Sequence, residues 1–164
     1  MNSDSRMNAC SQQILQIIEH AGPILHQTGD EEARKPVLRG GWSRKQVIGH
    51  LIDSASNNHQ RFVRAVLQDS LDFPGYDQDG CVRVQAVQEA PWKDLLALWM
   101  SYNRYLAHVI SQLPSSKLET MCRIGSGGPV TLGFLVEDYV VHMLHHLAQI
   151  GAAAERGSIT AAVR

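Results

Sequence analysis

The chain has 164 residues, of which 44% are hydrophobic and 19% are charged, and its formal net charge at pH 7 is −1. This length suits a unit that buries its own core, so we expect a single domain over residues 1–164. The near-zero charge argues against a nucleic-acid partner, which usually requires a basic surface. No apolar run matches a membrane span and the first residues do not resemble a signal peptide, so we expect a cytoplasmic protein with no membrane partner.

The cysteine content argues against a disulfide framework. Cys10, Cys81 and Cys122 are an odd number of thiols and lie far apart in the chain. Their spacing matches no cysteine metal site. We therefore expect reduced thiols.

Two helical patterns are expected in the first half of the chain. The first covers residues 9–27, where isoleucine and leucine recur at helical spacing, and Pro23 is expected to kink or divide it. The second begins after Ser43, an apt N-cap, and extends to about residue 68. A long polar connection follows over residues 69–89.

Two more helical patterns follow this connection. The third begins at Pro91, a residue tolerated in a first helical turn, and ends before Pro114. The fourth begins after Thr131, a plausible N-cap, and extends to about residue 155. Four amphipathic helices with a long crossover between the second and third predict an all-α four-helix bundle, a fold whose interior often holds a metal between facing helices.

The fourth pattern contains histidines spaced to share a metal ion. Positions four apart on a helix lie about 40° from each other, so His142 and His146 can bind one ion. His145 competes because it lies three residues after His142, and we favour His146. The alternative is that these imidazoles line the bundle and hydrogen-bond to other side chains.

A third ligand should come from another helix. His50 is the best candidate, because Val47, Leu51 and Ser54 give it an inward-facing helix surface. Three imidazoles leave coordination positions for water or substrate, as in catalytic rather than structural sites. Less favoured are His20, His26, His59 and His108.

Polar residues near these histidines are candidates for orienting them or for binding substrate. Asp138 and Gln149 share roughly the ligand face of the fourth helix, where they could accept an imidazole N–H. Asp53, Asn57 and Arg61 follow His50 on the second helix. The alternative for Asp53 and Arg61 is a polar pair on the helix surface. Trp42, Trp92 and Trp99 are expected to serve helix packing rather than ligand stacking.

Three segments carry a family resemblance. Residues 41–54 read Gly-Trp-Ser-Arg-Lys-Gln-Val-Ile-Gly-His-Leu-Ile-Asp-Ser and are followed by Asn57 and Arg61-Phe62. Residues 73–79 read Phe-Pro-Gly-Tyr-Asp-Gln-Asp, and residues 139–150 read Tyr-Val-Val-His-Met-Leu-His-His-Leu-Ala-Gln-Ile. Together these resemble the DinB-like superfamily, especially its YfiT-like branch. The resemblance implies a four-helix bundle in which His50, His142 and His146 bind a divalent metal, nickel or zinc.

The resemblance also implies an activity. Relatives include transferases that use bacillithiol, mycothiol or glutathione, so it implies a small-molecule substrate attacked by a low-molecular-weight thiol that the metal activates. Two alternatives stay open: hydrolysis by a metal-bound water, or a metal-binding protein without turnover. Met143 stands where a His-Glu-x-x-His metalloprotease keeps its general base, which argues against that class. A homodimer, as in many relatives, is also compatible with the resemblance.

Overall fold

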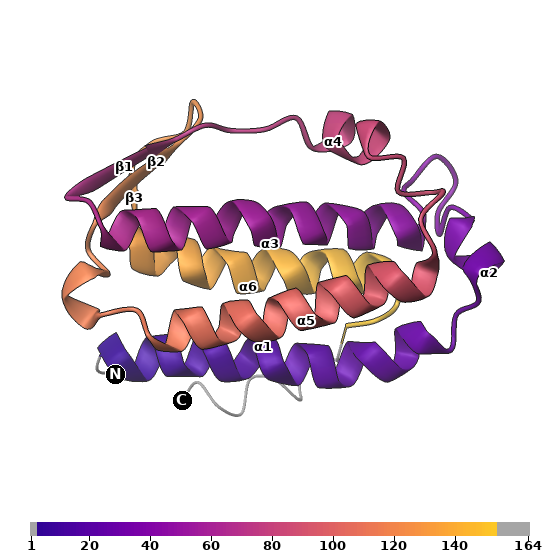
Figure 1. The fold of residues 1–164 in the computed structure, drawn as a ribbon, viewed down its shortest axis with the longest axis horizontal. Helices are drawn as coiled ribbons and strands as arrows, with labels where there is room; N and C mark the ends of the chain where they lie inside the picture. The colour runs from indigo at the N-terminus through magenta and orange to yellow at the C-terminus, as the bar shows by residue number, and fades with distance from the viewer. Residues whose placement is uncertain (1–2, 154–164) are drawn as a thin grey trace.

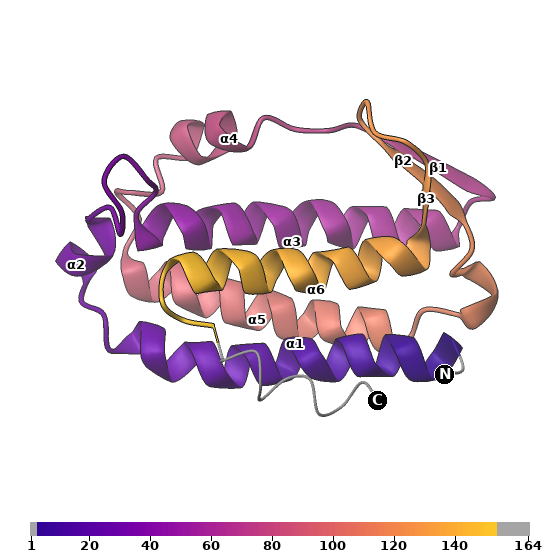
Figure 2. The same ribbon diagram turned by 180° about the vertical axis from the view of Figure 1, so that it is seen from behind.

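Four long helices form the bundle: α1 (Ser3–His26), α3 (Arg44–Val66), α5 (Trp92–Ser111) and α6 (Leu132–Gln149) (Figure 1). In this computed structural model, which describes residues 3–153, α1 packs mainly against α5 and α6, and α3 packs mainly against the same two helices. α3 and α5 run in one direction, whereas α1 and α6 run in the other (Figure 1; Figure 2). The predicted four-helix bundle is therefore confirmed.

Local sequence signals explain where the helices begin. The Ser43 side chain accepts a hydrogen bond from the Gln46 backbone N–H, and the Gln46 side chain accepts one from the Ser43 N–H, which is a capping box. Thr131 caps α6 in the same position, because its hydroxyl accepts a hydrogen bond from the Phe134 N–H. Both predicted N-caps are confirmed, and they fix the starts of the two helices that carry the candidate ligands.

Two predicted helix features differ in the structure. α1 is not divided at Pro23 but continues to His26, since this proline lies in the last turn, where few helical hydrogen bonds depend on it. α6 ends at Gln149, short of the predicted end near residue 155, which lies outside the described residues. The cause is Gly151, whose φ of +72° starts a Schellman motif in which the Ala152 N–H donates to the Leu147 carbonyl.

The crossover between α3 and α5 contains a strand and a helix, although it was predicted only as a long polar connection. It includes strand β1 (Ser70–Phe73) and helix α4 (Gln78–Val84). β1 pairs in parallel with β2 (Met121–Ile124), which pairs antiparallel with β3 (Val130–Thr131). Because α3 and α5 are parallel, the crossover must return along the whole length of α3, and Figure 1 shows this path from the sheet to α4. The return path covers one side of the α3 and α6 pair.

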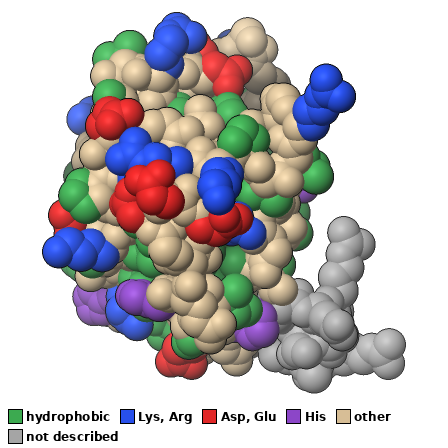
Figure 3. Space-filling model, turned by 90° about the vertical axis from the view of Figure 1, so that its right-hand side faces the viewer, with side chains coloured by type: hydrophobic (Ala, Val, Ile, Leu, Met, Phe, Trp, Pro, Cys, Tyr) green, Lys and Arg blue, Asp and Glu red, His purple; other side chains and the backbone are tan. Residues whose placement is uncertain are grey.

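The end of the bundle near the start of α3 carries mixed charges. The short helix α2 (Asp30–Arg34) contributes acidic and basic side chains, and Arg34 forms ion pairs with Asp30, Glu31 and Glu89. Figure 3 shows basic and acidic side chains next to one another on this face.

A 3-10 helix, η1 (Ser115–Lys117), precedes β2. None of the helices in the described part of the chain is long and apolar enough to cross a membrane.

A fully buried lysine holds this end together. Lys45 Nζ lies 3.0 Å from Asp30 Oδ2, 3.2 Å from the Gln88 carbonyl oxygen and 2.7 Å from the Ala90 carbonyl oxygen. The Asp30 carboxylate also accepts a hydrogen bond from the Trp92 N–H at 2.8 Å. These hydrogen bonds lower the pKa of Asp30. Lys45 therefore joins α2, α3 and the end of the crossover through one cation.

Glycine at position 49, next to His50, lets α3 pack closely against Val87 of the crossover. A Cβ on Gly49 would lie 2.7 Å from Val87 Cγ1, well inside van der Waals contact. Gly49→Ala is therefore expected to destabilise the protein by about 1–2 kcal/mol in urea unfolding, although alanine has the higher helix propensity. In the double variant Gly49→Ala/Val87→Ala the clash is absent. Its free energy of unfolding should therefore be no lower than that of Val87→Ala alone. A Gly49→Ala protein as stable as the wild type would contradict this packing.

Candidate metal centre

Three histidines from two antiparallel helices converge inside the bundle. His50 comes from α3, and His142 and His146 come from successive turns of α6. Each offers one ring nitrogen, and these nitrogens all lie within 4.8 Å of one another. His50 Nε2 and His142 Nε2 are 3.1 Å apart, and the His146 ring centroid lies 4.5 Å from the centroids of both other rings. We refer to these residues as the histidine triad.

The geometry of the triad fits a metal ion. Two imidazole nitrogens at about 2.0–2.1 Å from a tetrahedral metal are about 3.3–3.4 Å apart, close to the separation of the His50 and His142 nitrogens. Burial and the neighbouring His146 and His142 lower the pKa of His50 to about 3. Burial and the neighbouring His146 and His145 lower the pKa of His142 to about 4. Burial and the neighbouring His145 also lower the pKa of His146. Neutral imidazoles keep the lone pairs that a metal requires, so the triad could bind one.

These pKa values predict how the stability of the metal-free protein depends on pH. The unfolded chain takes up protons on His50 and His142 below about pH 6.5, whereas the folded chain does not until about pH 4. Stability should therefore fall as the pH drops from about 6.5 to about 4. Urea unfolding at several pH values should show a smaller loss in His50→Leu/His142→Leu than in the wild type. An equal loss in both proteins would contradict the prediction.

Two side chains orient two of the three rings of the triad, those of His146 and His142. His146 Nδ1 lies 3.0 Å from Gln149 Oε1, and the Gln149 amide nitrogen lies 3.0 Å from His145 Nε2. If His146 carries its proton on Nδ1, this N–H donates a hydrogen bond to Gln149 Oε1. The Nε2 of His146 is then free to bind a metal. Ser54 Oγ lies 3.4 Å from His142 Nδ1 and has the same function there. Gln149 was predicted in this role, whereas Ser54, one helical turn after His50, was predicted only to lie on the inward face of α3.

The other predicted polar residues do not bond to the triad. Both carboxylate oxygens of Asp53 lie 2.9 Å from the Gln85 amide nitrogen, so Asp53 holds the crossover to α3. The Asn57 side chain donates to the Asp53 backbone carbonyl. Asp138 is exposed on α6, and Arg61 is buried. Within residues 3–153, none of these four side chains hydrogen-bonds to a triad histidine, which leaves Asp138 and Arg61 as wall residues of the neighbouring cavity.

The other histidines lie outside the triad. His145 is exposed and contacts Gln149, in agreement with the preference for His146. His59 Nδ1 lies 3.1 Å from the Tyr102 hydroxyl on α5, and the His108 ring stacks near Tyr105. His20 and His26 are exposed on α1.

The three cysteines are free thiols, as expected. Burial raises the pKa of Cys10 to about 11 and also raises the pKa of Cys122. These two thiols therefore stay protonated at neutral pH, which makes them poor nucleophiles and poor metal ligands.

Cavities flank the triad on both sides along α6. The crossover cavity, of about 290 Å³, is bounded by α3, the crossover, β2 and α6 and reaches His142. A second cavity, of about 330 Å³, reaches His146 and Gln149 and is otherwise mainly apolar. The crossover cavity includes among its wall residues Ser54, Asn58, Arg61, Tyr76, Asp138 and His142.

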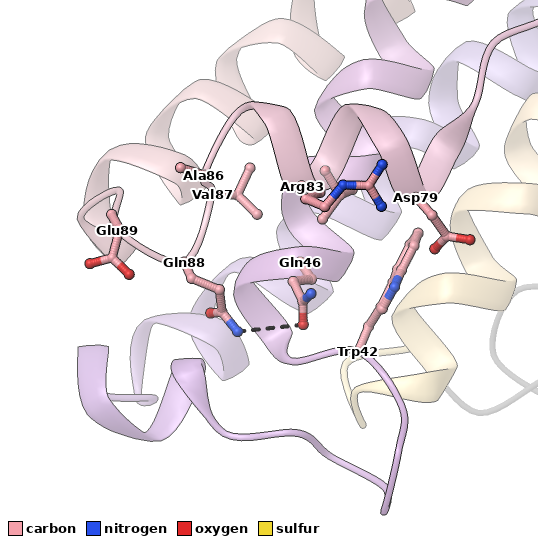
Figure 4. Close-up of a pocket in the computed structure, with 9 residues that line it drawn as sticks. Trp42, Gln46, Asp79, Arg83, Ala86, Val87, Gln88 and Glu89 are labelled. Atoms are coloured by element: carbon pink, nitrogen blue, oxygen red, sulfur yellow. Dashed lines mark hydrogen bonds between the residues drawn. The ribbon is translucent and has the colours of Figure 1, made fainter.

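Trp42 lies beside two rings of the triad and also lines a further pocket. Its ring centroid lies 5.2 Å from that of His50 and 6.4 Å from that of His146, with which it stacks. On its other side, Trp42 lines a pocket of about 440 Å³ together with Asp79 and Arg83 of α4 (Figure 4). The expectation of simple helix packing holds for the buried Trp92 and Trp99, whereas Trp42 is half-buried and shields two rings of the triad.

Comparisons with known proteins agree with this fold. The model of the DinB superfamily matches residues 16–150. A curated relative from Oceanobacillus iheyensis named "Putative metal-dependent hydrolase" is 25% identical over 137 residues, which cover 84% of this chain and 79% of the relative. The "Putative metal-dependent hydrolase YfiT" of Bacillus subtilis is 24% identical over 147 residues, which cover 87% and 83%.

A solved structure gives the same result for the fold. It is described as "YfiT from Bacillus subtilis is a probable metal-dependent hydrolase with an unusual four-helix bundle topology". The match has a TM-score of 0.74 at 22% identity and covers 92% of this chain and 85% of that one. Because the family model matches most of the sequence, this chain belongs to the DinB superfamily.

Proposed function

We propose that this protein is a metal-dependent enzyme in which His50, His142 and His146 bind one divalent ion, nickel or zinc. The observation that carries the proposal is the convergence of three neutral imidazoles, from two helices, beside a cavity. Three protein ligands leave a coordination position for a small molecule, as catalytic sites require. The relatives named as metal-dependent hydrolases support a metal in this family.

We further propose that the reaction is transfer of a low-molecular-weight thiol of the bacillithiol, mycothiol or glutathione type to an electrophilic small molecule. A divalent metal supplies one effect, a lower pKa for the thiol that it contacts. The thiol loses its proton, its sulfur bonds to the electrophilic carbon, and the leaving group departs with the bonding electrons. Ser54 and Gln149 hold the imidazoles in place, and Trp42 limits water access to His50 and His146.

Hydrolysis is the second candidate, and one wall residue favours it. Asp138 lines the crossover cavity together with His142, and in this candidate reaction its exposed carboxylate accepts a proton from the attacking water. The curated relatives carry the name hydrolase, which agrees with this candidate. In hydrolysis Asp138 takes the proton of the attacking water. In the thiol transfer, the proton of the thiol goes to solvent.

An activity comparison separates these candidates. Wild-type protein loaded with nickel or zinc is assayed for conjugation of glutathione or bacillithiol with monobromobimane, and for hydrolysis of 4-nitrophenyl acetate. The transferase proposal expects metal-dependent conjugation above the background rate, lost in His50→Ala and retained in Asp138→Asn. Ester hydrolysis that is lost in Asp138→Asn supports the hydrolase instead. Tight metal binding without either reaction contradicts both and leaves a metal-binding protein without turnover.

A further inference from the structure

Arg61 is a buried cation without an acidic partner. Only 9% of its surface is exposed, and its Nε is buried without a hydrogen-bond partner among residues 3–153. The guanidinium makes one long hydrogen bond, from Nη1 to Asn58 Oδ1 at 3.3 Å. No carboxylate in the described part of the chain lies within ion-pair distance of it. Because burial of an unpaired charge is costly, this arrangement indicates a site for an anion.

The guanidinium shares a cavity with the histidine triad. Arg61 and His142 both line the crossover cavity, Arg61 from α3 and His142 from α6. Ser54, which lies 3.4 Å from His142, precedes Arg61 by seven residues, or about 10 Å along the helix axis. One small molecule that extends along the cavity could therefore reach both residues.

The surroundings of Arg61 favour a planar anion. The Phe73 ring covers one face of the guanidinium, with Arg61 Cζ at 5.4 Å from the ring centroid. Apart from the bond to Asn58, the guanidinium N–H groups form no hydrogen bond with the described residues, and the edge of a guanidinium matches the two oxygens of a carboxylate. Burial and the nearby Asp53 raise the pKa of Tyr76 to about 12, so its hydroxyl remains a donor in the same cavity. Asp138, the acidic wall residue, is exposed and makes no ion pair with Arg61.

We propose that Arg61 binds a carboxylate of the small molecule that reacts at the triad. The ligand of this site is then an organic anion long enough to extend through the crossover cavity from the triad to Arg61. This inference rests on the proposed function, because it assumes that the ligand reaches the metal through the crossover cavity. The carboxylate can belong to the thiol or to the molecule that the thiol attacks.

The test compares ligands that differ only in their carboxylates. Binding of glutathione and of its diethyl ester to the zinc-loaded full chain is measured by calorimetry. We expect glutathione to bind at least about tenfold more tightly than the ester, since only the acid can form charge-assisted hydrogen bonds with Arg61. Arg61→Met should abolish this preference, and Arg61→Lys should keep part of it. Arg64→Met, an exposed change on the same helix, should keep all of it.

A second probe separates the two sources of the carboxylate. S-methylglutathione carries the carboxylates but no free thiol. If Arg61→Met weakens the binding of S-methylglutathione as much as the binding of glutathione, the carboxylate is recognised without the thiol, as expected for a substrate or product. If Arg61→Met weakens only the binding of glutathione, the carboxylate belongs to the thiol bound at the metal. Both results support the role of Arg61.

The proposal and the proposed function can fail separately. Wild-type protein that takes up no metal overturns the proposed function, whereas loss of S-methylglutathione binding in metal-free Arg61→Met would still support the anion site. Equal affinity of wild-type protein for the acid and the ester, including undetectable binding of both, overturns the anion site. That comparison needs no variant, so it holds even if Arg61→Met does not fold.

Discussion

His50→Ala is expected to weaken binding of nickel or zinc on the order of a hundredfold or more, because it removes one of three ligands and the only one from α3. The loss of His50 would leave the two imidazoles of α6 to hold the ion alone. Competition with a coloured chelator at pH 7.5 measures the affinity. The same chelator should extract metal from the variant at concentrations that leave the wild type loaded.

Two matched controls distinguish ligand loss from a general effect of removing histidine. His59→Ala changes a histidine on the same helix as His50 that contacts Tyr102 and not the triad. His145→Ala changes an exposed histidine next to His146. Both should bind metal far more tightly than His50→Ala, and His145→Ala should bind more weakly than His59→Ala because His145 contacts Gln149, which orients His146. Unchanged affinity in His50→Ala would remove this residue from the site.

Lys45→Met should cause a large loss of stability, because it removes a buried cation that three acceptors share. Methionine keeps most of the buried volume but leaves the Gln88 and Ala90 carbonyls without their donor, and it leaves Asp30 with only the more distant Arg34 as a cationic partner. We expect a loss of about 2–4 kcal/mol, since buried polar groups without partners are costly. The corresponding decrease in melting temperature is roughly 5–15 °C, measured by circular dichroism.

Lys93→Met provides the matched control for this loss, because Lys93 is exposed near the start of α5. It should change the melting temperature by no more than about 2 °C. The effect of Lys45→Met should also extend to the metal site, since the crossover end that Lys45 holds also packs on Gly49, next to His50. Equal melting temperatures for Lys45→Met and the wild type would contradict the role of this buried lysine.

Helical periodicity predicted much of the bundle because its signals are local. Ser43 and Thr131 mark helix starts through contacts within one turn, so they can be recognised from neighbouring residues alone. The spacing of His142 and His146 and the apolar surroundings of His50 follow from the same periodicity. Opposite helices of a bundle then bring these three residues together.

The crossover could not be predicted in the same way, because its structure depends on distant partners. β1 forms because β2, far along the chain, pairs with it, and four residues carry no periodic signal of their own. Asp53 shares roughly the face of His50 on α3, yet its carboxylate turns to Gln85 of the crossover. The cavity beside Arg61 likewise exists only once the crossover lies over α3 and α6.

X-ray absorption spectroscopy of the nickel- or zinc-loaded wild-type protein tests the central claim most directly. If the histidine triad binds the metal, the spectrum of the zinc protein should show three imidazole nitrogens at about 2.0–2.1 Å, with outer-shell scattering from their rings. His142→Ala should lose this signal, whereas His145→Ala should retain it. A spectrum with one imidazole or none, or with sulfur ligands from the cysteines, would contradict the metal centre described for His50, His142 and His146.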